Sequence, residues 1–190
     1  MNCIPTFARL LLAALLWGSA TLSLADEVGE VNLLLKAGQT TEAMLKLDQF
    51  LALKPKEPQL RFLKGILLSE TKRTAEAIAV FILLNEDYPE LPEPYNNLAV
   101  LYAGQGQYDK ARAALEAAVR GNPNYGTAYE NLGDVYTRLA AQAYGRALVL
   151  DPTNAALQPK IAQLRAQSTA KPADVRAAPA ARSAKAASSP

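Results

Sequence analysis

The clearest pattern in the chain lies between residues 92 and 125, where apolar residues recur at helical spacing on both sides of a short polar break. Before the break, positions i, i+3, i+4 and i+7 of one helix face carry Tyr95, Leu98, Ala99 and Tyr102. After it, a second apolar face carries Tyr108, Ala111, Leu115 and Ala118. Glycine adopts turn dihedrals at little cost, so Gly104-Gln105-Gly106 interrupts the pattern, and Pro123 ends it. The segment therefore predicts two short helices joined by a tight turn.

The same arrangement recurs along the chain at one constant interval. That interval separates the small residues Ala43, Ala77 and Ala111, and also the prolines Pro55, Pro89 and Pro123. From the second repeat on, a small residue stands at the eighth place, namely Gly65, Ala99 and Gly133. Three places later every repeat has a bulky residue, namely Leu34, Leu68, Tyr102 and Tyr136. A small residue lets two helix backbones approach, and a bulky neighbour fills the space beside it.

These small, bulky and proline positions, and their interval, resemble those of the tetratricopeptide repeat (TPR) family over roughly Asp26 to Pro152. The resemblance implies an all-α fold, a right-handed superhelical array of helix pairs. The four repeats are expected at about residues 24–57, 58–91, 92–125 and 126–152, the last one shortened. The alternative, a helical bundle with accidental spacing, requires several residue types to recur in phase by chance.

The second repeat lacks the turn glycine that the third repeat has. Thr71-Lys72-Arg73-Thr74 stands in its place, and we expect Thr74 to cap the helix that follows.

The fourth repeat is too short for a normal helix pair. Its closing proline, Pro152, follows Pro123 by five residues fewer than the interval that separates the earlier prolines. The missing residues are those that would form the turn. Between Glu130 and Asp151 there is no proline or strong turn cluster. We therefore expect both helices to fuse into one of about 22–25 residues, whose far end exposes Tyr144, Leu148 or Leu150. The alternative is a cramped but ordinary hairpin.

Residues 1–25 read as a signal peptide. Arg9 precedes an apolar core at Leu10–Trp17, and Ser23-Leu24-Ala25 supplies small residues for cleavage after Ala25. We expect a periplasmic or otherwise exported chain. The alternative is an uncleaved N-terminal membrane anchor, although its apolar stretch is shorter than the ~20 residues of a spanning helix. After cleavage we expect no stable membrane span.

The C-terminal part changes character after the last repeat. Residues 153–167 predict one amphipathic capping helix, with Ile161 and Leu164 facing inward. Residues 168–190 are rich in Ala, Pro and Ser and lack aromatic residues, so we expect a disordered basic tail. The tail is either a flexible tether or a weak electrostatic contact with anionic lipid or an envelope polymer.

Composition narrows the chemistry. The chain has no histidine, and Cys3, its one cysteine, lies in the predicted signal peptide. Histidine- or thiol-based catalysis and His/Cys metal sites are therefore excluded from the mature chain, and we expect no cofactor. A net charge of +2 gives no reason to expect nucleic-acid binding. An enzyme would have to work through carboxylates alone, so we expect a non-enzymatic protein.

The TPR resemblance implies that the first helix of each repeat lines a concave groove. The matching positions give these partner-binding candidates: Phe62, Ile66, Glu70, Asn96, Val100, Glu130, Asp134 and Arg138. Such a groove is apolar at one end and acidic at the other, which suits a peptide with an apolar anchor and a nearby basic residue. The carboxylate-clamp subgroup of the family is not supported, because only Asn96 fits its pattern.

The sequence therefore predicts an adaptor of the bacterial cell envelope that captures a peptide or protein segment. Two other functions stay open. One is a structural homo-oligomer that pairs through the projecting fused helix. The other is an envelope-polymer or lipid binder that acts through the basic tail.

Overall fold

The computed structural model describes residues 23–170, and all regular secondary structure in that range is helical. The predicted all-α fold is therefore confirmed. The predicted signal peptide, apart from its last three residues, and most of the predicted tail lie outside the described range. The chain forms two compact parts, one ending at Pro55 and the other beginning at Lys56.

The first part is one helix pair, α2 (Ser23–Lys36) and α3 (Thr40–Leu53). Helix α2 begins at Ser23, which is before the signal cleavage site predicted after Ala25. Val31, Ala43 and Leu47 are fully buried between the two helices. An ion pair joins the start of α2 to the end of α3, because the ammonium group of Lys54 lies 2.9 Å from the Glu27 carboxylate.

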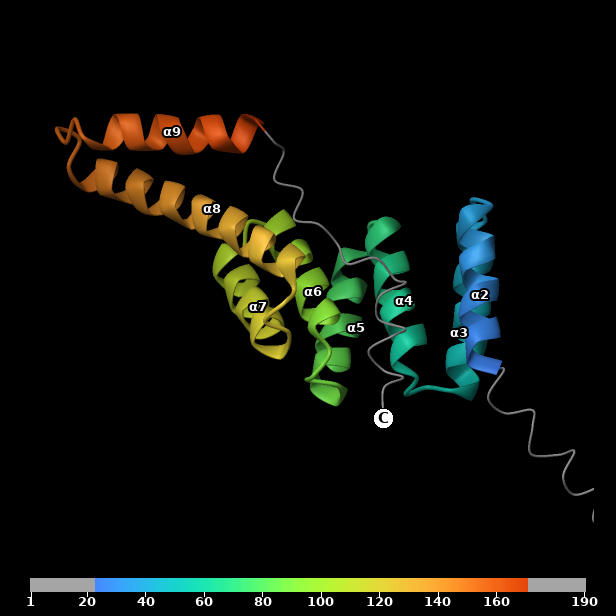
Figure 1. Ribbon diagram of the computed structural model, residues 1–190. Helices are drawn as coiled ribbons and strands as arrows, with labels where there is room; N and C mark the ends of the chain where they lie inside the picture. The colour runs from blue at the N-terminus through green and yellow to red at the C-terminus, as the bar shows by residue number, and fades with distance from the viewer. Residues whose placement is uncertain (1–22, 171–190) are drawn as a thin grey trace, which may run out of the picture. The chain divides into compact units, whose positions relative to one another are not determined.

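The second part contains the remaining helices of the described range (Figure 1). They are α4 (Pro58–Glu70), α5 (Thr74–Asp87), α6 (Pro92–Gly104), α7 (Tyr108–Gly121), α8 (Gly126–Leu150) and α9 (Leu157–Ala170). Each helix packs on the next one along the chain, from α4 to α9. Proline stands in the first turn of α4 and of α6, where its missing N–H has no helical partner to lose.

The turns inside the first three repeats share one backbone conformation. Gly38, Lys72 and Gly106 stand at the same place in successive repeats and have φ angles of 74°, 63° and 72°. In each turn the next amide donates to the carbonyl five residues earlier, a Schellman bond of 2.9 Å. Repeat two therefore builds the same turn without glycine. The predicted cap at Thr74 is wrong: Arg73 is the N-cap, and Thr74 is the first helical residue.

Arg73 also ties this turn to the start of α5. Its guanidinium donates to both carboxylate oxygens of Glu76, each at 2.7 Å. The hydrogen bond and the positive charge of Arg73 hold the pKa of Glu76 below its ordinary value.

The core follows the phase of the repeat. Ala77 and Ala111 are fully buried, and the second-helix residues Phe81 and Leu115 pack beside them. Gly65 permits the close approach of α4 and α5, because a Cβ atom there would lie 2.6 Å from the Phe81 ring. At Gly65 the small eighth position of the repeat therefore has the steric role that its spacing predicts.

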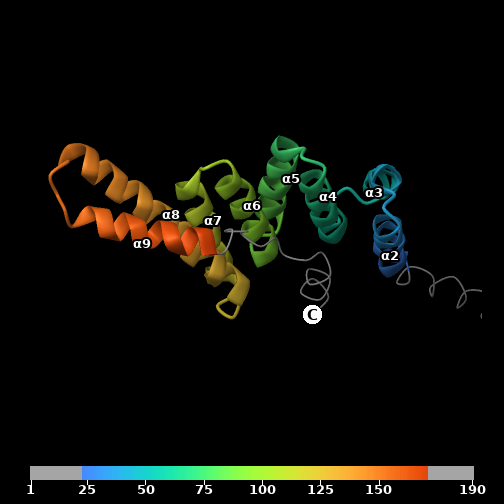
Figure 2. The ribbon, with the colours of Figure 1, turned by 90° about the horizontal axis from the view of Figure 1, so that it is seen from above.

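Helix α8 runs unbroken over 25 residues, which confirms the predicted fusion of the fourth helix pair. Its second half extends beyond α6 and α7, and α9 runs back alongside it (Figures 1 and 2). The apolar face of α9 is buried at Leu157 and Ile161, and Lys160 lies over the Tyr144 ring at 5.4 Å. Leu150 is 86% exposed as predicted, whereas α9 leaves Tyr144 and Leu148 only half-exposed.

Candidate functional site

The candidate site lies on the first helices of the second to fourth repeats. Helix α4 contacts α6, and α6 contacts α8, in addition to the contacts between consecutive helices. These three helices therefore share one surface. The predicted groove residues between Phe62 and Arg138 all lie on them.

A small cavity of about 50 Å³ opens where α4 meets α6. It is lined by Ile66, Ser69, Glu70, Phe81, Asn97 and Val100. Three predicted groove residues, Ile66, Glu70 and Val100, thus come together from two repeats. Ile66 and Val100 are half-buried and Glu70 is exposed, so the cavity has an apolar interior and a charged edge.

The lining determines what this cavity accommodates. Phe81, Ile66 and Val100 offer carbon surface, which favours a small apolar side chain over a polar one. The Ser69 hydroxyl can donate a hydrogen bond to a peptide group beside such a side chain, or accept one from it. The Glu70 carboxylate at the edge favours a nearby positive charge. Within the described residues no cluster of three His, Cys, Asp or Glu side chains is placed to hold a metal ion.

Two predicted groove residues lie in the core and not on the surface. Phe62 is 2% exposed, and its ring packs on Phe81 with the centroids 5.8 Å apart. Asn96 is fully buried, and its Oδ1 accepts a 2.7 Å hydrogen bond from the Asn131 amide of the next repeat. The expectation that both side chains line the groove is therefore corrected. Their position on the first helix is as expected, but each points toward a neighbouring helix.

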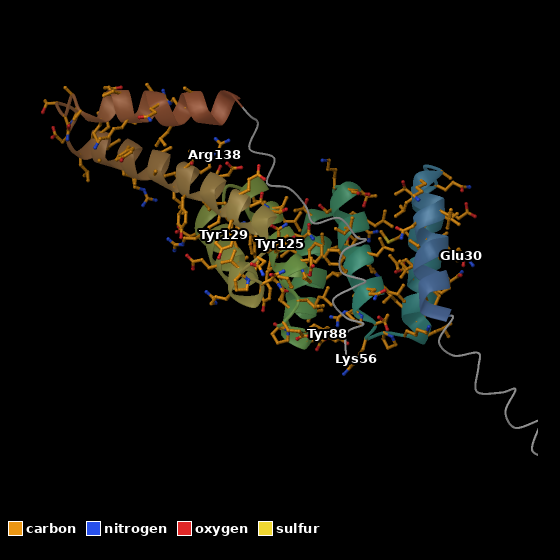
Figure 3. The ribbon with its side chains drawn as sticks, in the orientation of Figure 1. Glu30, Lys56, Tyr88, Tyr125, Tyr129 and Arg138 are labelled. Carbon is orange, nitrogen blue, oxygen red and sulfur yellow. The ribbon has the colours of Figure 1, made fainter. Side chains whose placement is uncertain are left out.

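The last three candidates lie on α8. Glu130, Asp134 and Arg138 are four residues apart, so they follow one face of the helix. Glu130 is exposed, whereas Asp134 and Arg138 are half-buried. Arg138 lies near the middle of α8, where the second half begins to leave α6 and α7 (Figure 3). The predicted acidic end of the groove is therefore on the surface.

Three residues of the cavity, Ser69, Asn97 and Phe81, are not among the predicted partner-binding candidates. Asn97 follows a groove position directly, and its amide also donates to the Glu93 carbonyl at 3.1 Å. Phe81 belongs to a second helix and reaches the cavity from behind α4. Phe81 could have been found from its position within the repeat. That position puts its large ring opposite Gly65, where it has to fill the space between α4 and α5.

No helix within residues 23–170 combines the length and the apolar character that crossing a membrane requires.

Comparison with known families identifies the repeats. Two models described as tetratricopeptide repeat match residues 28–90 and 70–133, which together make up more than half of the chain. The chloroplastic tetratricopeptide repeat domain-containing protein PYG7 of Arabidopsis thaliana is 38% identical over 79 residues. That alignment covers 39% of this chain and 26% of PYG7, so the chain spans about a quarter of the length of this relative.

Solved structures agree on the fold at low sequence identity. The first TPR of Spaghetti (RPAP3), bound to the HSP90 peptide SRMEEVD, has a TM-score of 0.57 at 18% identity, covering 61% of this chain and 92% of its own. MamA from Desulfovibrio magneticus has a TM-score of 0.56 at 21% identity, covering 84% and 90%. YrrB, described as a TPR protein with an unusual peptide-binding site, has a TM-score of 0.53 at 18% identity, covering 78% and 79%. With its repeat phase, turns and helix pairs, the chain belongs to the tetratricopeptide repeat family.

Proposed function

We propose that this chain is a non-enzymatic adaptor that captures a peptide or protein segment on the surface of α4, α6 and α8. The observation that carries the proposal is the cavity between α4 and α6, where Ile66 and Val100 meet beside Glu70. The RPAP3 structure is described as bound to an HSP90 peptide, and YrrB is described as having an unusual peptide-binding site. Both descriptions support a peptide-binding use of this fold.

The bound segment is inferred from the lining of the cavity. A small apolar side chain enters between Ile66 and Val100, and a basic residue follows within reach of Glu70. The exposed Glu130 and the half-buried Asp134 extend the acidic character along α8. A segment that crosses from α4 to α8 therefore combines one apolar anchor with basic residues.

The test is site-specific photocrosslinking in the native host. A photoreactive amino acid replaces Ile66 or Val100 in the cavity, and the control replaces Leu83, an exposed apolar residue on α5. A discrete adduct from residues 66 and 100, absent from residue 83, supports capture at the cavity, and mass spectrometry identifies the partner. Equal labelling from residue 83, or no adduct, contradicts it.

The setting that we propose is the bacterial cell envelope. Its support is the composition of residues 1–25, with Arg9, the apolar Leu10–Trp17 and the small residues before Asp26. Fractionation of the host followed by N-terminal sequencing tests this. A periplasmic chain that begins at Asp26 supports export and cleavage, whereas an intact N-terminus in the membrane fraction supports the anchor.

A further inference from the structure

The fourth repeat keeps the residues of a helix pair whose two halves do not meet. Ala111, Leu115 and Ala118 lie twelve, eight and five residues before Pro123. The residues at the same distances before Pro152 are Ala140, Tyr144 and Ala147. The second half of α8 therefore carries the face that the second helix of a repeat presents to its own first helix.

In the second and third repeats this face is covered. Phe81, the equivalent of Tyr144, is 1% exposed and packs against Gly65 of its own repeat. Leu115, the equivalent in the third repeat, is fully buried, and so is Ala99, which stands at the position of Gly65.

In the fourth repeat both sides of the same contact are partly exposed, although Lys160 of α9 lies over the Tyr144 ring. Gly133 stands at the position of Gly65, is exposed, and has no atom within 4 Å of where a Cβ would lie. Tyr136 is 48% exposed, although its hydroxyl donates to Glu116 at 3.3 Å. Ala140, Tyr144 and Ala147 are only half-buried.

The continuous helix explains why the two sides stay apart. An α-helix rises about 1.5 Å per residue, so residues 133 and 144 lie roughly 16 Å from each other along α8. The contact of α8 with α9 is kept, like that of α5 with α6 and of α7 with α8. Among the described residues, the second half of α8 therefore lacks one neighbour that the second helix of the other repeats has. That neighbour is the first helix of its own repeat.

We infer that a second copy of this chain supplies that neighbour by exchanging halves of α8. Residues 140–150 of each copy pack on residues 126–137 of the other, and the two α8 helices run antiparallel. Placing Tyr144 of the second copy on Gly133 sets a two-fold axis between Arg138 and Leu139, and the same register brings Ala140 close to Tyr136. One symmetric interface thus remakes the missing hairpin contact twice.

The missing turn favours this exchange over a hairpin within one chain. A closed hairpin needs several residues to reverse the chain, and the five residues that form the turn in other repeats are absent here. A shortened connection that straightens into a helix is a known route to exchanged dimers, because the same contacts form without the strained turn. The interface uses the hairpin face of α8 and leaves the cavity between α4 and α6 free.

Cysteine crosslinking tests the register. The full chain with Cys3→Ser receives Gly133→Cys and Tyr144→Cys together, and a bismaleimide too short for the roughly 16 Å within one straight helix is added. A covalent dimer is expected from the double variant. Neither single variant should give a covalent dimer. With a two-fold axis between Arg138 and Leu139, residue 133 of one copy lies roughly 16 Å along the helices from residue 133 of the other, and the same holds for residue 144. A crosslink confined to one chain, or no crosslink, overturns the exchange.

Sedimentation velocity at micromolar concentration separates the exchange from other ways of pairing. In the single chain α8 can accommodate Gly133→Gln, because nothing lies within 4 Å of where the new Cβ would be. In the proposed dimer the glutamine side chain would occupy the place of Tyr144 from the second copy. The substitution is expected to raise the dimer dissociation constant at least tenfold. Gly145→Gln is the control and should leave the constant unchanged, because residue 145 lies at least about 100° around the helix from the paired residues Ala140, Tyr144 and Ala147. Inserting five turn residues after Arg138 should give a monomer. A monomeric parent chain, or a Gly133→Gln variant with the dissociation constant of the parent chain, overturns the proposal.

Discussion

Two glycines in the turn between α6 and α7 are expected to respond in opposite directions to alanine. Gly104 is the last residue of α6, whereas Gly106 has a φ of 72°. Neither has an atom within 4 Å of where a Cβ would lie, so no clash enters the comparison. The two substitutions differ only in what the backbone conformation costs an L-residue with a side chain.

The magnitudes follow from that difference. At Gly104 alanine limits the unfolded chain and suits a helix, which stabilises the fold by about 0.5–1 kcal/mol. At Gly106 the left-handed conformation costs alanine about 1–2 kcal/mol. Alanine also lowers the conformational entropy of the unfolded chain, which offsets about 0.4–1 kcal/mol of this cost. The net effect at Gly106 is a loss of about 1 kcal/mol. The two variants should therefore differ by roughly 1.5–2 kcal/mol.

Urea unfolding followed by far-ultraviolet circular dichroism measures both effects. We expect the midpoint to rise for Gly104→Ala and to fall for Gly106→Ala, with unchanged slopes. Gln105→Ala, between them, is the control for changing this turn at all. Shifts of the same sign for both glycines, or a higher midpoint for Gly106→Ala, would refute the reasoning.

Three further substitutions test the repeat. Lys72→Gly relieves the φ of 63° and should raise stability by up to about 1 kcal/mol in the same urea assay; a lower midpoint would contradict this. Gly65→Ala places a methyl group 2.6 Å from the Phe81 ring and should cost about 1–3 kcal/mol, less in a Phe81→Leu background; an equal cost in both backgrounds would count against that contact. Asn131→Ala removes the buried 2.7 Å hydrogen bond to Asn96 and should lower stability by about 1–3 kcal/mol in thermal unfolding; no change would mean that the bond contributes nothing.

The helix pairs could be predicted from the sequence because their signals are local. Apolar spacing fixes a helix face, and proline and glycine mark where the chain leaves the helix. The fused α8 could also be predicted, because a missing turn is visible as five absent residues against the constant period of the other repeats. The turn at Lys72 shows that hydrogen bonding and packing of the flanking helices impose a conformation that the residue itself does not favour.

The cavity could be predicted only in part. A position within the repeat assigns a residue to the first helix, and this was enough to place Ile66 and Val100 beside each other. It does not fix how far each helix is rotated or what the next repeat offers. Phe62 is therefore buried against Phe81, and Asn96 against Asn131, although their repeat positions are groove positions.

The contribution of Asn97 depends on contact across helices. Only the approach of α4 to α6 brings its amide to the cavity that Ile66 and Val100 line. Sequence spacing within one helix carries no information on that approach.

The most direct test of capture at the cavity is the affinity for the segment that crosslinking identifies, measured with Val100→Asp. A carboxylate in the cavity that Ile66 and Phe81 also line opposes an apolar anchor, so we expect the dissociation constant to rise at least tenfold, or about 1.4 kcal/mol. Leu83→Asp, on the exposed face of α5, is the matched control and should bind like the unaltered chain. Unchanged affinity for Val100→Asp, or an equal loss for Leu83→Asp, would contradict capture at this cavity.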